Sequence, residues 1–173
     1  MTPDDGSPRR LSYEELEASL EAFLRDWNGT TALWVFGYGS LIWKPELSFD
    51  MRRPARVHGY HRRLCLWSRI NRGTPQCPGL VAGLDRGGSC TGVVYRVPAT
   101  AVRSQFLQLW QREMMTNSYA PRHLECRLDD ESFYVTTTSS GARSDSSVKA
   151  RMTSATPPPQ SSCGPTRWRP SAV

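Results

Sequence analysis

The chain contains no long hydrophobic segment. Nowhere in its 173 residues is there a run that approaches the ~20 apolar residues of a membrane-spanning helix. Residues 1–10 carry Pro, Asp and Arg and contain no apolar core of a secretory signal. We therefore expect neither a protein with membrane-spanning helices nor a secreted one.

Cysteine motifs for metal or disulfide chemistry are missing as well. The five cysteines are odd in number and form no C-x-x-C pair, which favours free thiols in a reducing compartment and predicts a cytoplasmic protein. They are Cys65, Cys77, Cys90, Cys126 and Cys163. His58 and His61 lie three residues apart in a strand-like stretch, where they face opposite sides and suit a metal poorly. The sequence also lacks a P-loop and any recognisable Ser-His-Asp or Cys-His spacing.

Acidic residues are outnumbered by basic ones, and the formal net charge is +6. Many basic side chains lie in one central stretch, which contains Arg52, Arg53, Arg56, Arg62, Arg63, Arg69 and Arg72. Three interpretations of this stretch are open: it binds nucleic-acid phosphates, it attracts a small polycarboxylate ligand, or it forms a solvated strand face. Because no nucleic-acid-binding motif accompanies the arginines, we rank a nucleic-acid partner last and expect none.

The length fits one domain, and the composition divides the chain into three segments. Residues 1–30 form an N-terminal segment with one amphipathic helix, and residues 31–135 contain most of the short apolar runs. Residues 136–173 are rich in Ser, Thr, Arg and Pro and keep neither a strand nor a helix period, which predicts a disordered tail.

The apolar pattern predicts two helices and several short strands. Ser12 and Glu15 form a capping box, and the helix after them is expected to stop at Asn28-Gly29. A second helix is expected over about 101–115. Strands are predicted at 33–36, 57–60, 64–67, 80–84, 92–97 and 122–128, with a hairpin turn at 85–88. This content indicates an α+β domain with a small, partly closed β-barrel and flanking helices.

The first predicted strand runs into the sequence Gly37-Tyr38-Gly39-Ser40 and then becomes apolar again. Glycines on both sides of a tyrosine permit backbone angles that other residues resist, so the chain can turn sharply here. Such a turn directs several N–H groups and a hydroxyl at one point, which suits a carboxylate or an oxyanion. An ordinary turn with a packed tyrosine is the alternative.

One carboxylate lies on the apolar stripe of the second predicted helix. Phe106 and Leu109 are three residues apart, and a further step of four leads to Glu113. Either Glu113 reaches solvent or pairs with Arg112 or Arg122, or it points into a partly dry pocket. In such a pocket, desolvation raises the pKa of a carboxyl group towards the working range of a general base.

Three separated motifs closely resemble the ChaC family of glutathione-specific γ-glutamylcyclotransferases. They are Val35-Phe36-Gly37-Tyr38-Gly39-Ser40-Leu41 with Trp43 and Pro45 nearby, Arg72-Gly73-Thr74-Pro75 followed by Pro78-Gly79, and Arg112-Glu113-Met114. Each motif is weak alone. Together, in the family's order over about residues 33–128, they are specific.

The resemblance implies cleavage of glutathione into 5-oxoproline and cysteinylglycine, without a metal or an organic cofactor. The α-amine of the glutamyl moiety attacks its own γ-carbonyl, so the protein supplies positioning and proton transfer. By the same resemblance Glu113 is the catalytic acid/base. The implied substrate loop consists of Val35, Phe36, Gly37, Tyr38, Gly39, Ser40 and Leu41. Tyr38 either contacts substrate or packs as a wall, and Arg72 either approaches the glycyl carboxylate or shapes its own loop.

After about Ser132 the family pattern disappears. The further strand, the tyrosine-bearing loop and the C-terminal helices of the family give way to Phe133-Tyr134-Val135 and the tail, as in a chain that ends early or is read out of frame. Loss of a packed layer exposes sheet edges and apolar surface. The alternative function is therefore an inactive family member that binds ligand or a partner without turnover. The sequence indicates no oligomeric state.

Overall fold

The structure, a computed structural model, describes residues 9–69, 72–116, 119–128 and 131–140. Its elements in chain order are α1 (Tyr13–Phe23), β1 (Leu33–Gly37), the 3-10 helix η1 (Ser40–Ile42), β2 (Met51–Ser68), β3 (Gly79–Val97), the 3-10 helix η2 (Ala99–Ala101), α2 (Val102–Glu113), β4 (Tyr119–Leu128) and β5 (Glu131–Ser140). Within these ranges no helix has the length and hydrophobicity needed to cross a lipid bilayer.

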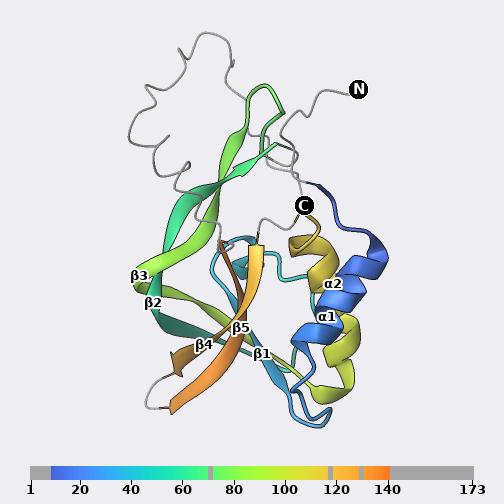
Figure 1. The fold of residues 1–173 in the computed structure, drawn as a ribbon. Helices are drawn as coiled ribbons and strands as arrows, with labels where there is room; N and C mark the ends of the chain where they lie inside the picture. The colour runs from blue at the N-terminus through green and yellow to red at the C-terminus, as the bar shows by residue number, and fades with distance from the viewer. Residues whose placement is uncertain (1–8, 70–71, 117–118, 129–130, 141–173) are drawn as a thin grey trace, which may run out of the picture.

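The five described strands close into one barrel in the order β1-β3-β2-β4-β5 (Figure 1). Neighbouring strands are antiparallel except β1 and β5, which pair in parallel at Val35 and Thr136 and so complete the closure. The predicted class, an α+β domain with a small β-barrel, is confirmed, and the barrel is closed where we expected partial closure.

Alternate strand positions fill the interior of the barrel, because successive side chains of a strand point to opposite faces. Phe36 on β1, Val57 on β2, Leu84 and Val94 on β3 and Cys126 on β4 are all completely buried there. Their neighbours in the chain point outwards, towards the helices or the solvent. The barrel interior is therefore a packed core, and a ligand site has to lie at its rim.

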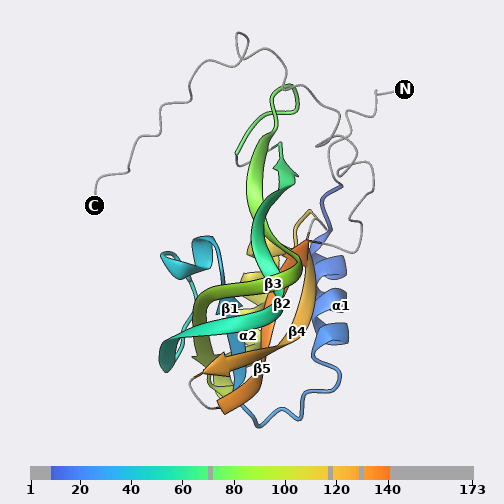
Figure 2. The same ribbon diagram turned by 90° about the vertical axis from the view of Figure 1, so that its left-hand side faces the viewer.

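Both α-helices lie on one side of the barrel and pack against each other (Figures 1 and 2). The predicted capping box is present, since the Ser12 hydroxyl accepts from the Glu15 N–H and the Glu15 carboxylate accepts from the Ser12 N–H. α1 ends at Phe23, several residues before the predicted stop at Asn28-Gly29.

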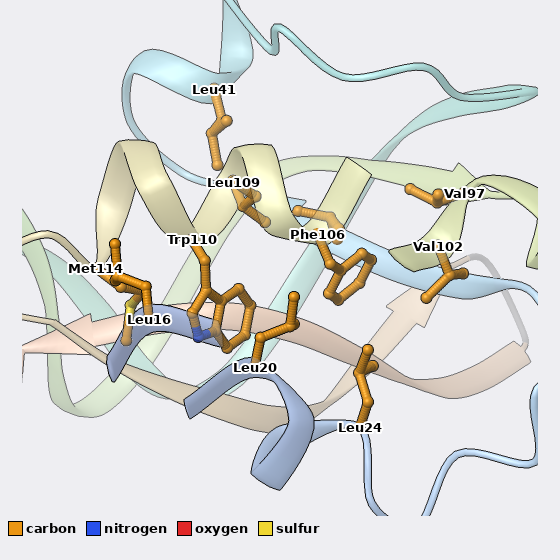
Figure 3. Close-up of a cluster of buried hydrophobic side chains, with 11 residues drawn as sticks. Leu16, Leu20, Leu24, Leu41, Val97, Val102, Phe106, Leu109, Trp110 and Met114 are labelled. Atoms are coloured by element: carbon orange, nitrogen blue, oxygen red, sulfur yellow. The ribbon is translucent and has the colours of Figure 1, made fainter. Parts of the chain in front are cut away.

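A second core lies between the helices and the outer face of β1 and β3 (Figure 3). Leu16 and Leu20 of α1 meet Phe106 and Trp110 of α2 there, and Phe106 and Trp110 are at most 1% exposed. Full burial of one such side chain stabilises the fold by roughly 1.5–3 kcal/mol. This core fixes the position of α2, and with it the position of Glu113 at the end of that helix.

Four of the predicted short strands are wrong as separate elements. The strands predicted at 57–60 and 64–67 are parts of β2, and those predicted at 80–84 and 92–97 are parts of β3. β2 and β3 form one continuous hairpin whose outer part extends well beyond the barrel (Figures 1 and 2). The expected turn at 85–88 is an irregularity within β3: Gly87 and Gly88 have positive φ, but Arg86 still pairs with Tyr60 and Ser89 with His58. A glycine-rich break that bends a strand has the same local sequence as a hairpin turn.

The boundary predicted at residue 135 also falls inside an element. β5 runs from Glu131 to Ser140, and both Thr136 and Thr137 are buried. The Thr137 hydroxyl donates to the carbonyl oxygen of Phe36 (3.0 Å), which accounts for a polar side chain in the core. Threonine favours strands, so the threonine-rich composition that we took as the start of a tail continues the barrel. The rest of that predicted tail lies outside the described residues.

We expect Phe106→Ala to lower the free energy of unfolding by about 3–5 kcal/mol, because it empties a fully buried site against Phe23 and Trp110. Trp43→Ala is the matched control: Trp43 is 71% exposed, and its loss should change stability by no more than about 0.5 kcal/mol. Urea denaturation followed by circular dichroism measures both. Equal losses of unfolding free energy in the two variants would contradict a core between the helices and the barrel.

Candidate active site

The chain turns sharply directly after β1. The 3-10 helix η1 is closed by hydrogen bonds from the Ile42 N–H to the Gly39 carbonyl (2.9 Å) and from the Trp43 and Lys44 N–H groups to the Ser40 carbonyl (3.2 and 2.8 Å). From β3, the Tyr95 hydroxyl donates to the carbonyl oxygen of Leu41 (2.7 Å). The loop is thus tied both to itself and to the barrel wall.

Glycine is required at this turn for close packing. A Cβ on Gly37 would lie 2.9 Å from the Cβ of Leu41, and a Cβ on Gly92 of β3 would lie 2.4 Å from the Gly37 carbonyl oxygen. Neither Gly37 nor Gly39 has a positive φ, and a Cβ on Gly39 would meet nothing within 4 Å. The expectation that both glycines supply unusual backbone angles is therefore wrong for Gly37, whose role is steric.

Most side chains of the predicted substrate loop belong to the core. Val35 and Leu41 pack in the cluster beneath the helices, and Phe36 and Tyr38 pack in the barrel interior. All four are less than 9% exposed. Whether Tyr38 contacts substrate stays a prediction, and the hydroxyl of Ser40 and backbone N–H groups are the other groups of the loop that suit a ligand.

The leading N–H groups of η1 are available. Within the described residues, no hydrogen bond is donated by the N–H groups of Gly39, Ser40 or Leu41. The first N–H groups of any helix lack partners inside that helix. Close to the Ser40 hydroxyl, they form a cluster of donors suited to a carboxylate or an oxyanion.

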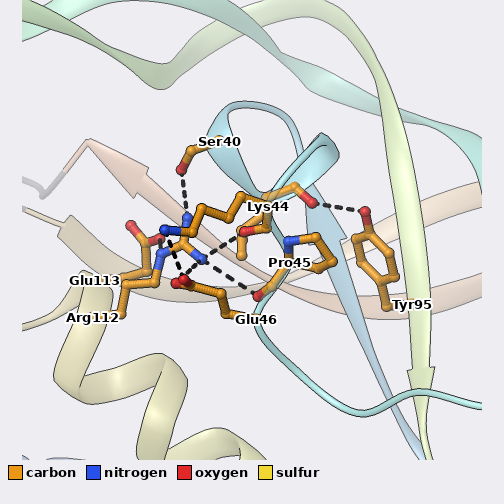
Figure 4. A network of polar contacts seen from close by, with 8 residues as sticks. Ser40, Lys44, Pro45, Glu46, Tyr95, Arg112 and Glu113 are labelled. Carbon is orange, nitrogen blue, oxygen red and sulfur yellow. Dashed lines mark hydrogen bonds and ion pairs between the residues drawn. The ribbon is translucent and has the colours of Figure 1, made fainter. Parts of the chain in front are cut away.

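Arg112, the penultimate residue of α2, connects this loop to the helix (Figure 4). Its guanidinium donates to the Ser40 hydroxyl (2.8 Å), to the Lys44 carbonyl oxygen (2.6 Å) and to the Glu46 carboxylate (2.9 Å). Its Nε lies 3.1 Å from Oε1 of Glu113. A single planar cation therefore fixes three chain segments, a geometry that the ammonium group of lysine cannot reproduce.

Glu113 combines the two fates that the sequence left open. It pairs with Arg112, and only 16% of its side chain is exposed. Burial raises its pKa above the ordinary value, the positive charge of Arg112 partly offsets this effect, and the negative charge of Glu46 adds to it. The result is a carboxyl group that protonates more readily than a solvated one.

A third side chain, Tyr119 at the start of β4, was not predicted from the sequence. Its hydroxyl donates to the Ala82 carbonyl oxygen (3.2 Å), and its pKa is raised to about 12 by burial, by the negative charge of Glu113 and by Cys65. Tyr119 packs against the cluster that contains Met114, the residue after Glu113, and it remains a neutral hydroxyl over the physiological pH range. Its place follows from closure of the barrel, which local sequence patterns do not report.

Arg72 is the predicted site residue that the structure does not bring to this cluster. It lies in the loop at the outer end of the β2–β3 hairpin (Figures 1 and 2), and its N–H donates to the Ser68 hydroxyl (3.0 Å). A Cβ on Gly79 would lie 1.6 Å from the Arg72 carbonyl oxygen, so the main chain packs tightly here. Among the described residues, no contact joins Arg72 to Ser40 or Glu113.

The described residues contain no group of three His, Cys, Asp or Glu side chains that could hold a metal ion. Cys65, Cys90 and Cys126 are free thiols, as expected, whereas Cys77 is disulfide-bonded, contrary to that expectation.

Comparisons with known proteins support the motifs. A family model described as ChaC-like protein matches residues 33–157, beyond the point near Ser132 where we expected the resemblance to end. The chain is 40% identical over 119 residues to the glutathione-specific gamma-glutamylcyclotransferase of Escherichia coli (strain K12), covering 69% of this chain and 52% of that one. It is 32% identical over 121 residues to glutathione-specific gamma-glutamylcyclotransferase 1 of Homo sapiens, covering 69% and 54%. The chain thus spans about half the length of these curated relatives.

Solved structures support the fold. A crystal structure of a gamma-glutamyl cyclotransferase specific to glutathione from yeast superimposes with a TM-score of 0.60, at 23% identity, over 66% of this chain and 71% of that chain. YkqA from Bacillus subtilis superimposes with a TM-score of 0.51, at 22% identity, over 69% and 43%. Both likenesses concern the fold alone.

We expect Gly37→Ala to lower stability by about 1–3 kcal/mol, because its methyl group forces Leu41 or the loop to move. Gly39→Ala is the control for this loop, since a methyl group there meets no atom within 4 Å. Thermal unfolding of the two variants compares them directly. A larger loss for Gly39→Ala would contradict the packing role assigned to Gly37.

The raised pKa of Glu113 also predicts a pH-dependent stability. A carboxyl that holds its proton more tightly when folded contributes stability below its unfolded pKa, and this contribution is lost as the pH rises through the folded pKa. We therefore expect Glu113→Gln to be more stable than the parent protein at pH 7–8, with a difference that shrinks below about pH 4. Urea unfolding at both pH values measures it, with the exposed Glu125→Gln as control. Equal stabilities of parent and Glu113→Gln at pH 8 would contradict the burial effect.

Proposed function

The chain belongs to the ChaC-like family, and on that premise we propose that it is a γ-glutamylcyclotransferase that cleaves glutathione into 5-oxoproline and cysteinylglycine. The observation that carries the proposal is the contact of Arg112 with both Ser40 and Glu113. This contact brings the predicted substrate loop and the predicted acid/base together at one end of the barrel.

The reaction requires no nucleophile from the protein. The α-amine of the γ-glutamyl moiety attacks the γ-carbonyl carbon, a new C–N bond closes the five-membered lactam, and the amide bond to cysteinylglycine breaks. The α-ammonium group has to lose a proton before the attack, and the leaving amine has to gain one. The protein contributes by holding the amine against the carbonyl and by moving that proton.

Glu113 serves both proton transfers. As a carboxylate it accepts a proton from the α-ammonium group, and as a carboxylic acid it returns the proton to the departing amine. A carboxyl with a raised pKa is suited to both steps, because it takes up and holds a proton more readily than a solvated carboxyl does. Arg112, 3.1 Å from Glu113, keeps the carboxyl oriented towards the loop.

The loop holds the other end of the glutamyl group. The Ser40 hydroxyl and the free N–H groups at the start of η1 bind the α-carboxylate and stabilise the oxyanion that develops at the γ-carbonyl. In this assignment the loop acts through its backbone and Ser40, while Val35, Phe36, Tyr38 and Leu41 hold the backbone in place. Arg72 remains a predicted contact of the glycyl carboxylate, without support from its position in the fold.

We place this activity in the cytoplasm, where a reducing environment keeps Cys65, Cys90 and Cys126 as thiols; the disulfide-bonded Cys77 is the exception. A second candidate is a family member that binds glutathione without turnover. The observation that favours it is the length of the chain, which spans about half of its curated relatives.

The test is release of 5-oxoproline from glutathione by the purified chain, measured by mass spectrometry. We expect turnover by the parent protein and a loss of about 10²–10⁴-fold in kcat for Glu113→Gln, because that variant cannot exchange a proton. Glu125→Gln, an exposed carboxylate on β4, should keep full activity. A folded parent protein that binds glutathione without releasing 5-oxoproline would reject the enzyme and favour the second candidate.

A further inference from the structure

One arginine in the described structure has a buried side-chain nitrogen without a hydrogen-bond partner. The Nε atom of Arg122 is buried and makes no hydrogen bond, and it is the one buried side-chain nitrogen or oxygen among the described residues of which this is true. No described ion pair involves Arg122 either. A buried donor without an acceptor is costly, so such a group calls for a ligand, an ion or a water molecule.

Arg122 lies at the end of the barrel where the candidate active site is found. On β4 it shares a strand face with Leu124 and Cys126, both buried in the barrel interior. Its partner across the β4–β5 ladder is Thr137, whose hydroxyl donates to the Phe36 carbonyl oxygen. Phe36 belongs to the predicted substrate loop, so only β5 separates Arg122 from the strand that carries this loop.

The same strand also approaches the acid/base. Tyr119, three residues before Arg122 and on the opposite face of β4, packs against the cluster that contains Met114, the residue after Glu113. Glu113 pairs with Arg112 through Nε and Oε1 (3.1 Å), and no described ion pair joins it to Arg122. Arg122 therefore stands at the rim of the same site, yet outside the immediate surroundings of the carboxyl that handles the proton.

The separation of Arg122 from Glu113 indicates which of the two carboxylates of glutathione Arg122 can bind. The α-carboxylate shares a carbon atom with the reacting amine, so it has to lie near Glu113 and the Ser40 loop. The glycyl carboxylate is separated from the scissile amide by the whole cysteinyl residue. An arginine that is near the site but away from Glu113 matches the second carboxylate.

We propose that Arg122 binds the glycyl carboxylate of glutathione through its guanidinium and so selects γ-glutamyl peptides that end in a free carboxylate. The inference rests on the proposed function. A planar guanidinium binds a carboxylate through two parallel hydrogen bonds, which satisfies the buried Nε and gives geometric selectivity. The role assigned from sequence to Arg72 thereby passes to an arginine that the fold holds at the site.

The experiment compares glutathione with its glycyl monoethyl ester, which lacks the charge of that carboxylate and keeps the γ-glutamyl group unchanged. The parent protein should show a kcat/KM about 10- to 100-fold lower for the ester, the effect expected of one charged hydrogen-bonded contact. Arg122→Gln should raise KM for glutathione by a similar factor, leave kcat nearly unchanged, and turn over the two substrates equally well. Arg122→Lys should restore part of the preference for glutathione.

Two further variants make the result specific. Arg127→Gln removes an exposed arginine from the same strand and should behave like the parent protein. Arg72→Gln tests the competing assignment. Circular dichroism and urea unfolding establish whether each variant is folded. If Arg122→Gln does not fold, Arg122→Lys provides the test.

Three results would overturn the inference: an unchanged KM for glutathione in both Arg122 variants, an equal loss of activity on glutathione and on its ester, or a loss of selectivity in Arg72→Gln instead. If the parent protein turns over neither substrate, the proposed function fails on its own. Calorimetric binding of glutathione and of the ester to the same variants then decides the role of Arg122. Equal affinity of the parent protein for both ligands would reject it.

Discussion

The guanidinium of Arg112 is the interaction on which the candidate site depends. This guanidinium is more than a surface charge. Its N–H groups contact Ser40 after β1, the segment of Lys44 and Glu46, and Glu113 in the same helix. Without it, the carbonyl oxygen of Lys44 and the carboxylate of Glu113 would lose a charge-assisted partner at the same time. Interactions of this kind are the stronger class of hydrogen bonds, and a shared donor makes the segments interdependent.

That interaction needs α2 to end at one particular place on the barrel. Phe106 and Trp110 set the position of the helix by packing on α1 and on the outer face of the sheet, and Arg112 and Glu113 follow in the next turn. On the opposite side of the loop, Gly92 of β3 allows close approach to Gly37. The two apolar cores therefore define a site to which they contribute no reactive group.

Sequence reasoning found what local patterns encode. The capping box at Ser12 and the placement of Glu113 on an apolar stripe follow from spacing within one helix, and both are present in the structure. The hairpin arm was missed because the glycines of 85–88 have the same sequence signature in a bent strand as in a turn. The hydrogen bonds of Arg112 could not be predicted from local patterns, since its partners Ser40 and Lys44 lie 72 and 68 residues away in the chain. Tyr119 and Arg122 reach the site only through closure of the barrel.

The charges of the site also explain which chemistry the protein can perform. Burial raises the pKa of the Cys126 thiol to about 11 and raises that of Cys90, so at neutral pH both are poor nucleophiles. The groups near the loop that can take part in a reaction are a carboxyl that protonates readily and an arginine that orients it. This set matches a reaction whose nucleophile belongs to the substrate. In such a reaction the protein has to bind both ends of a flexible peptide and exchange one proton between two amines. In the proposed function, a donor-rich loop binds one end of the peptide, Arg122 binds the other and Glu113 exchanges the proton, so few side chains suffice.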